Sequence, residues 1–271
     1  KLINLYGVVL VCLIITLTNQ KGGVGKTTST SSLITGLGLQ NYKVLGIDLD
    51  PQGNLGFSLG LDVENSTTVY EVLKGSVDIH DAIYKTEFSD IIPSNILLSS
   101  SELEFNRSGR EFLLKEQIDL IKDNYDFIII DTPPALNILT VNAYVCSNFL
   151  IIPMVPDILS LLGVSQLKET VQTVKKFYNA DLQVMGLLLT KYNRRTNLAK
   201  EVEELANEIA EQLDTAIFES KIRTSVAVAE APAHGESVLL YAPSSKPTLD
   251  YINFIEEVLV RCKAARKSEQ N

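Results

Sequence analysis

The chain has 271 residues, of which 45% are hydrophobic and 21% charged, and its formal net charge at pH 7 is −9. These proportions are typical of a globular protein and exclude a largely disordered chain. The acidic balance argues against attraction of nucleic acid by the whole surface and leaves local basic patches as the way to bind it.

The chain begins with residues 1–10, which we expect to be an N-terminal extension. The apolar run at residues 8–17 is about ten residues long, too short to span a bilayer, and it leads into a glycine-rich loop. We interpret this run as a buried strand. Three cysteines, Cys12, Cys146 and Cys262, lie far apart without a C-x-x-C spacing, which argues against a disulfide framework and fits a reducing cytoplasm.

Further strand candidates alternate with helical segments. Strands are predicted at residues 11–18, 43–48, 126–131, 149–153 and 182–190, and several are apolar almost throughout, as expected where helices cover both faces of a sheet. Helices are predicted at residues 28–39, around 69–73 and 111–122, and along three later apolar stripes: Leu159, Leu162, Leu167, Val171, Val174; Leu198, Val202, Leu205, Ile209, Leu213; and Leu249, Ile252, Ile255, Leu259. The pattern predicts an α/β fold with a doubly wound, mostly parallel sheet flanked by helices.

The predicted organisation is a single domain at residues 11–262 followed by a C-terminal tail at residues 263–271. Residues 54–125 are richer in polar residues, and we expect them to form an insertion on one side of the sheet.

The stretch TNQKGGVGKTTST, residues 18–30, is typical of a phosphate-binding loop between a strand and a helix. Its glycines let backbone N–H groups turn inward, and the helix N-terminus that follows favours anions. The glycine that usually opens such a loop is replaced by Gln20, and Lys21 adds a second lysine. We predict phosphate binding by Lys21, Gly22, Gly23, Val24, Gly25, Lys26, Thr27 and Thr28, with Lys26 reaching the β- and γ-phosphates and Thr27 holding Mg²⁺.

Three aspartates follow two of the predicted strands. Asp48 and Asp50 end one strand in VLGIDLDPQGN, and Asp131 ends another in YDFIIIDTPP. A lone aspartate at the end of a strand is more often a cap or turn residue. Three of them beside a phosphate loop favour a role in metal binding or in orienting water, so Thr27, Asp48 and Asp131 are predicted to hold or surround the metal.

These motifs together resemble the ParA/Soj partition ATPases, which are deviant Walker A members of the MinD/ParA superfamily of P-loop ATPases. The likeness rests on KGGVGKTT, IDLDPQGN and IIIDTPP, and later segments extend it over nearly the whole chain. The resemblance implies an ATPase that uses ATP and Mg²⁺ and forms a homodimer when ATP is bound. It also implies that Lys21 contacts the partner subunit's nucleotide and that Asp50 helps to position or activate the attacking water, while Asp48 bonds the loop or the metal's waters. Asn193, in TKYN, matches a position that contacts adenine, although a turn role is the alternative.

The resemblance further implies binding of nonspecific DNA, a ParB-like partner and a cytoplasmic protein that joins the nucleoid when it holds ATP. Arg195 and Arg223 match basic positions of that DNA surface, but Ala227 replaces a second arginine of the family pattern. Two alternatives stay open: a MinD-like positioning ATPase that acts on a membrane or protein cargo, and an ATP-dependent small-molecule enzyme of the same fold. Membrane binding is not expected, because the basic residues near the C-terminus extend an apolar stripe that fits a core helix.

Overall fold

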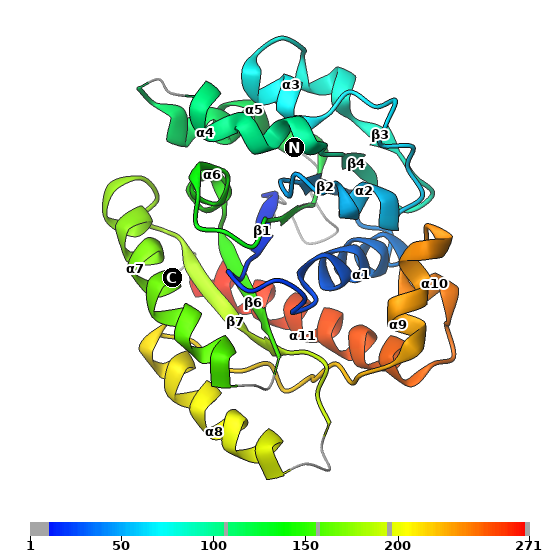
Figure 1. The fold of residues 1–271 in the computed structure, drawn as a ribbon, viewed down its shortest axis with the longest axis vertical. Coiled ribbons are helices and arrows are strands. Elements are labelled where there is room, and N and C mark those ends of the chain that lie inside the picture. The colour runs from blue at the N-terminus through cyan, green and yellow to red at the C-terminus, as the bar shows by residue number, and fades with distance from the viewer. Residues whose placement is uncertain (1–10, 106–107, 156–157, 194–196, 269–271) are drawn as a thin grey trace.

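The computed structural model describes residues 11–105, 108–155, 158–193 and 197–268 (Figure 1). Within them a seven-stranded sheet has the order β3-β4-β2-β5-β1-β6-β7. All neighbouring strands are parallel except β3 and β4, which are antiparallel. The strands are β1 (Leu13–Leu17), β2 (Val44–Asp48), β3 (Tyr84–Lys85), β4 (Asp90–Ile92), β5 (Phe127–Asp131), β6 (Phe149–Met154) and β7 (Gln183–Leu189).

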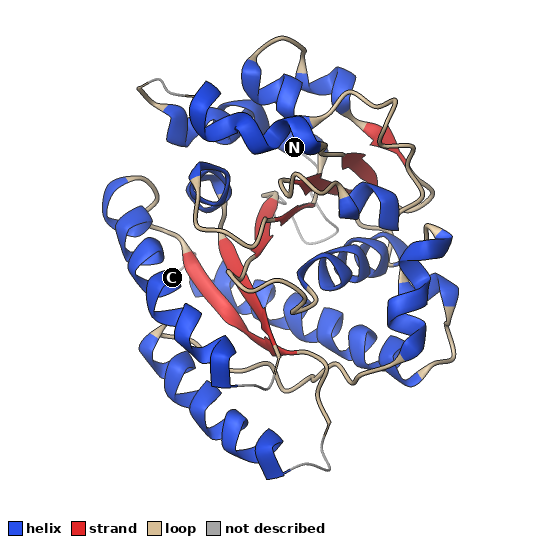
Figure 2. Ribbon diagram, viewed as in Figure 1, coloured by secondary structure: helices blue, strands red, loops and turns tan. Residues whose placement is uncertain are grey.

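Helices cover both faces of this sheet (Figure 2). The α-helices are α1 (Lys26–Leu39), α2 (Asn54–Ser58), α3 (Val69–Lys74), α4 (Ser101–Glu104), α5 (Leu113–Ile121), α6 (Ile138–Cys146), α7 (Ile158–Phe177), α8 (Asn197–Gln212), α9 (Val226–Glu230), α10 (Val238–Tyr241) and α11 (Lys246–Ser268). Short 3₁₀ helices are η1 (Ile79–Ala82), η2 (Ile96–Ser100), η3 (Arg110–Phe112), η4 (Lys122–Asn124) and η5 (Ala231–His234).

Strand β1 shows how the core divides into two layers. Leu13, Ile15 and Leu17 pack with α1, α10 and α11, whereas Ile14 faces the layer formed by α3, α5, α6, α7 and α8. Alternate side chains of a strand point to opposite faces, so a strand covered on both faces must be apolar at successive positions. The predicted doubly wound α/β fold is therefore confirmed.

The structure changes three details of the sequence prediction. In α8 the predicted stripe is wrong at Leu205, which is 36% exposed. Residues 54–125 are not only an insertion beside the sheet, because β4 pairs with β2 and brings β3 with it, which extends the sheet itself. In α11, Leu249 and Ile252 are 55% and 39% exposed, so the predicted stripe is wrong at these two positions; the helix packs instead through residues such as Tyr251, Phe254 and Val258.

The predicted extension at residues 1–10 lies outside the described residues. Helix α11 continues to Ser268, into the segment that we assigned to the tail. The division of the chain into an extension, one domain and a tail stays a prediction.

Candidate active site

The glycine loop joins β1 to α1, at the edge of the sheet where the parallel strands end. Gly23 and Gly25 have φ angles of 72° and 83°, in the left-handed region that side chains other than glycine rarely adopt. Gly25 is the N-cap of α1 and offers no side chain to cap it. The first N–H groups of a helix have no acceptor within the helix, so the start of α1 is open to an anion.

Polar groups fix the path of this loop from both sides. The Thr190 hydroxyl, which follows β7, donates to the carbonyl of Val24 at 2.7 Å. The Asn19 carboxamide accepts the N–H of Lys21 at 2.9 Å, and the ammonium of Lys26 donates to the carbonyl of Lys21 at 3.1 Å. The loop is thus held in shape by its own residues and by a neighbouring strand.

Asp131 connects the end of β5 to the first turn of α1. Its two carboxylate oxygens accept hydrogen bonds from the Thr27 hydroxyl at 2.6 Å and the Thr30 hydroxyl at 3.0 Å. The residue is fully buried, and burial raises its pKa to about 6 even though these hydroxyls and the charge of Lys26 act in the opposite direction. Asp131 is therefore a carboxylate that a nearby cation would stabilise.

Asp48 lies directly beside Asp131, because β2 and β5 are parallel neighbours in register at these two residues. It is fully buried, and its oxygens accept the backbone N–H groups of Asp50 and Leu55, both at 2.9 Å. Burial and the charge of Asp131 raise the pKa of Asp48 well above its usual range. Asp48 thus holds the loop between β2 and α2 in place through these two hydrogen bonds. The sequence pattern did not distinguish this structural role from the predicted role in metal binding.

Asp50 and Lys26 face one cavity. Asp50 as a whole residue is only 9% exposed. One of its carboxylate oxygens accepts the backbone N–H of Gln52 at 3.0 Å. Burial lowers the pKa of Lys26, while the charges of Asp131 and Asp50 raise it. The ammonium therefore lies within the electrostatic reach of both carboxylates.

The cavity has a volume of about 670 Å³, within the usual range of small-molecule sites. The glycine loop and Asp50 form one side, α2 another, and the segment from Ile222 to Pro232 a third. Its residues include Gly22, Gly23, Gly25, Lys26, Thr27, Thr28, Asp50, Asn54, Phe57, Thr190, Arg223 and Val228.

The residues present fit a magnesium ion that is held mainly by phosphate and water. Mg²⁺ prefers oxygen ligands and commonly takes only one or two carboxylates beside substrate phosphates. Thr27, at the start of α1, and Asp131, at the end of β5, supply such oxygens side by side. In the described part of the chain, no group of three or more His, Cys, Asp or Glu side chains is arranged to hold a metal ion by itself.

Asn193 does not line this cavity. It is exposed and lines a neighbouring polar cavity of about 510 Å³, and the two cavities share Arg223. A contact between Asn193 and a nucleotide base stays a prediction.

Arg223 is held by a buried carboxylate that the sequence did not point to. Its guanidinium forms two hydrogen bonds of 2.6 Å to Asp250, whose side chain is 8% exposed, and its backbone N–H donates to the same carboxylate at 3.1 Å. Arg223 therefore already has a charged partner, and it lies at the rim of the cavity. Arg195, the other predicted DNA-binding residue, lies outside the described residues.

The strand–loop–helix unit and the carboxylates at the ends of the two neighbouring strands define a P-loop ATPase of the deviant Walker A type. The family model described as an AAA domain matches residues 12–184. The sporulation initiation inhibitor protein Soj of Bacillus subtilis is 41% identical over 90% of this chain and 97% of its own length. The chromosome partitioning protein ParA of Caulobacter vibrioides is 36% identical over 92% of this chain and 94% of its own length.

The chain belongs to the ParA/Soj family of partition ATPases, as its motifs indicated. Solved structures agree in fold. Cobyrinic acid a,c-diamide synthase from Mycobacterium smegmatis, with bound ADP and magnesium, is 32% identical, with a TM-score of 0.82 over 94% of this chain and 97% of that one. A putative plasmid partition protein from Borrelia burgdorferi bound to AMPPNP is 27% identical, with a TM-score of 0.78 over 92% and 99% of the two chains. Over the described residues, no helix has the length and apolar character needed to cross a membrane.

Proposed function

We propose that this ATPase forms a dimer around ATP, binds nonspecific DNA in that state, and positions a plasmid or chromosome region with a ParB-like partner. Relatives named as chromosome and plasmid partition proteins support this function. The observation that carries it is the unequal placement of the two lysines in the glycine loop. Lys26 lines the cavity beside the loop, whereas Lys21 is not among the residues that line it.

The chemistry follows from this placement. In phosphoryl transfer the protein mainly positions groups and stabilises charge. Lys26 would bind the β- and γ-phosphates, Thr27 and Asp131 would hold Mg²⁺, and Asp50 would orient the attacking water. Bound Mg²⁺ would neutralise phosphate charge. Lys21, whose main chain is tied to Asn19 and Lys26, would reach the nucleotide of a second subunit and so couple hydrolysis to assembly.

Three variants test the proposal. Lys26→Ala should abolish nucleotide binding, Lys21→Ala should keep it but lose the ATP-dependent dimer, and Asp50→Ala should accumulate that dimer without turnover. The measurements are nucleotide affinity, phosphate release, and mass by light scattering with and without ATP. A Lys21→Ala protein that dimerises and hydrolyses ATP normally would rule out the action of this lysine across the dimer.

DNA binding requires its own test, because Arg195 lies outside the described residues and the guanidinium of Arg223 is bonded to Asp250. Wild-type protein should sediment with a DNA duplex when ATP is present and lose affinity steeply as salt rises. Sedimentation with liposomes but not with DNA would favour the MinD-like alternative. Phosphate release that depends on a small molecule, with no effect of DNA, would favour an enzyme of the same fold. We also propose that the protein is cytoplasmic and associates with the nucleoid in its ATP form.

A further inference from the structure

A second cavity lies between α7, α8 and the beginning of β7. It has a volume of about 370 Å³. Residue Thr190, beyond the other end of β7, contacts the glycine loop, so this cavity lies at the opposite edge of the sheet from the candidate active site. It is lined by Lys168, Val171, Gln172, Lys175, Lys176, Ala180, Leu182, Val184, Gln212, Leu213 and Asp214.

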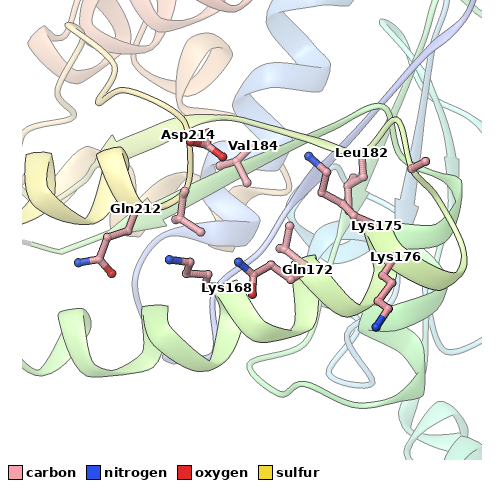
Figure 3. Close-up of a pocket in the computed structure, with 11 residues that line it drawn as sticks. Lys168, Gln172, Lys175, Lys176, Leu182, Val184, Gln212 and Asp214 are labelled. Carbon is pink, nitrogen blue, oxygen red and sulfur yellow. The ribbon is translucent and has the colours of Figure 1, made fainter.

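The floor of this cavity is apolar and its rim on α7 is basic. Beneath the surface lie the buried Val171, Leu182 and Leu213, and the apolar side chains that solvent reaches are the half-buried Val184 and the exposed Ala180. Lys168 and Lys175 are seven residues apart, so they lie on one face of the helix, about 10 Å apart along its axis. Figure 3 shows Lys168 and Gln212 beside the same open space, whereas Lys176 points away from it. The cavity thus combines apolar surface with two cations on one side.

The two rim lysines carry uncompensated charge. Neither Lys168 nor Lys175 has an ion pair or hydrogen bond to another residue in the parts of the chain that the structure describes. Lys176 differs, because its ammonium lies 4.9 Å from the centre of the Phe177 ring. An occupant with separated negative groups would therefore find unused partners at Lys168 and Lys175.

The surrounding charge argues against nucleic acid as this occupant. Asp214 lines the cavity, and α8, which contributes Gln212 to the lining, also carries the exposed Glu208 and Glu211. A DNA duplex carries a negative charge about every 1.7 Å along its axis, so a duplex that reached both lysines would also bring phosphates close to Asp214, whereas a segment with widely spaced carboxylates would not. A single inorganic anion would leave the apolar side chains of Ala180 and Val184 exposed to water. A peptide with acidic and apolar side chains can pair with the lysines of the rim and also cover the apolar lining.

We propose that this cavity is a docking site for an acidic, amphipathic segment of a partner protein. Its carboxylates would pair with Lys168 and Lys175, and an apolar side chain would cover Ala180 and Val184. In a polyproline II segment, residues three positions apart share a face and lie about 9 Å apart, which matches the spacing of the two lysines. The site does not depend on the nucleotide cycle proposed above.

A peptide of three Glu-Pro-Leu repeats is a suitable probe, with a fluorescent label read by anisotropy. Wild-type protein should bind it, and the double variant Lys168→Ala/Lys175→Ala should bind at least about fivefold more weakly, since two exposed ion pairs are lost. A double variant of exposed lysines elsewhere, Lys85→Ala/Lys263→Ala, should bind like wild type. All three proteins should keep the same ATPase rate and melting temperature.

Peptides of Gln-Pro-Leu and Lys-Pro-Leu repeats separate the contributions of charge and apolar contact. The proposal requires that both bind more weakly than the glutamate peptide and that only binding of the glutamate peptide falls with salt. It is overturned if wild-type protein does not bind the glutamate peptide at about 1 mM, or if the α7 double variant binds it normally. It is also overturned if that variant loses affinity for a DNA duplex and keeps its affinity for the peptide.

Discussion

The buried carboxylate of Asp131 should make the nucleotide-free protein less stable at neutral pH than in mild acid. Its pKa rises from 3.8 to about 6 on folding, mainly through burial. The folded protein therefore holds this proton more tightly than the unfolded chain does. As pH rises from about 4 to about 6, the free energy of unfolding falls, and above that range the loss is complete.

The size of the effect follows from the pKa values. The interval between 3.8 and about 6, at 1.36 kcal/mol per pH unit, corresponds to about 3 kcal/mol. Asp131→Asn removes the charge, but the amide can accept only one of the two hydrogen bonds from Thr27 and Thr30, which costs about 1 kcal/mol. At pH 8 the variant should be more stable than wild type by about 2 kcal/mol, and at pH 4 this advantage should be gone.

Urea unfolding followed by circular dichroism, with EDTA and without nucleotide, measures this difference. Other groups titrate in the same range, so the quantity of interest is the variant minus wild type at each pH. Asp181→Asn, at an exposed position, is the matched control and should show no such trend. If Asp131→Asn differs from wild type by the same amount at pH 5 and pH 8, the buried carboxylate is not the cause. ATP with Mg²⁺ should stabilise wild type more than the variant.

Three further outcomes are expected. Thr190→Val removes the hydroxyl that donates to the Val24 carbonyl. This variant should lose about 1 kcal/mol of stability and bind ATP more weakly. An unchanged ATP affinity, measured by calorimetry, would show that the loop keeps its shape without this hydrogen bond. Gly235→Ala places a Cβ 2.9 Å from the Gly60 Cα at a φ of 66°, so thermal unfolding should show a loss of about 1–3 kcal/mol, whereas an unchanged melting temperature would contradict this contact. Burial raises the pKa of the Cys146 thiol to about 12, so this thiol should not react with iodoacetamide in the native protein at pH 8. Mass spectrometry after the treatment should find Cys146 unmodified, and rapid alkylation would contradict its burial.

Much of the fold could be predicted because the central strands are buried on both faces. All five predicted strands are confirmed, and each was a nearly continuous apolar run. Strands β3 and β4 could not be predicted in this way, since they have two and three residues and β4 begins with the polar Asp90. The exposed Leu249 and Ile252 show the complementary error, because spacing along a helix does not reveal which of two apolar faces meets the core.

The site was predictable where its residues follow one another in sequence. The glycine loop and Asp131 are recognisable because a strand leads directly into each. The hydrogen bond from Thr190 to the loop joins two residues that are 166 positions apart in the sequence. Arg223 and Asp250 are 27 positions apart. No local pattern marks such contacts. The consequence for function is concrete, since an arginine predicted to contact DNA is also the partner of a buried carboxylate, and its replacement would disturb both.

The two hydrogen bonds of Asp48 span the loop that carries Asp50 and tie it to the start of α2. The backbone of Asp50 and the start of α2 thus share one anchor, so we expect a shift of the Asp50 backbone to be felt by α2. Phe57, on α2, is 53% exposed and also lines the cavity, and the chain contains no tryptophan. Phe57→Trp would thus introduce a single indole at this position, and its fluorescence would follow the ATPase through its cycle in real time.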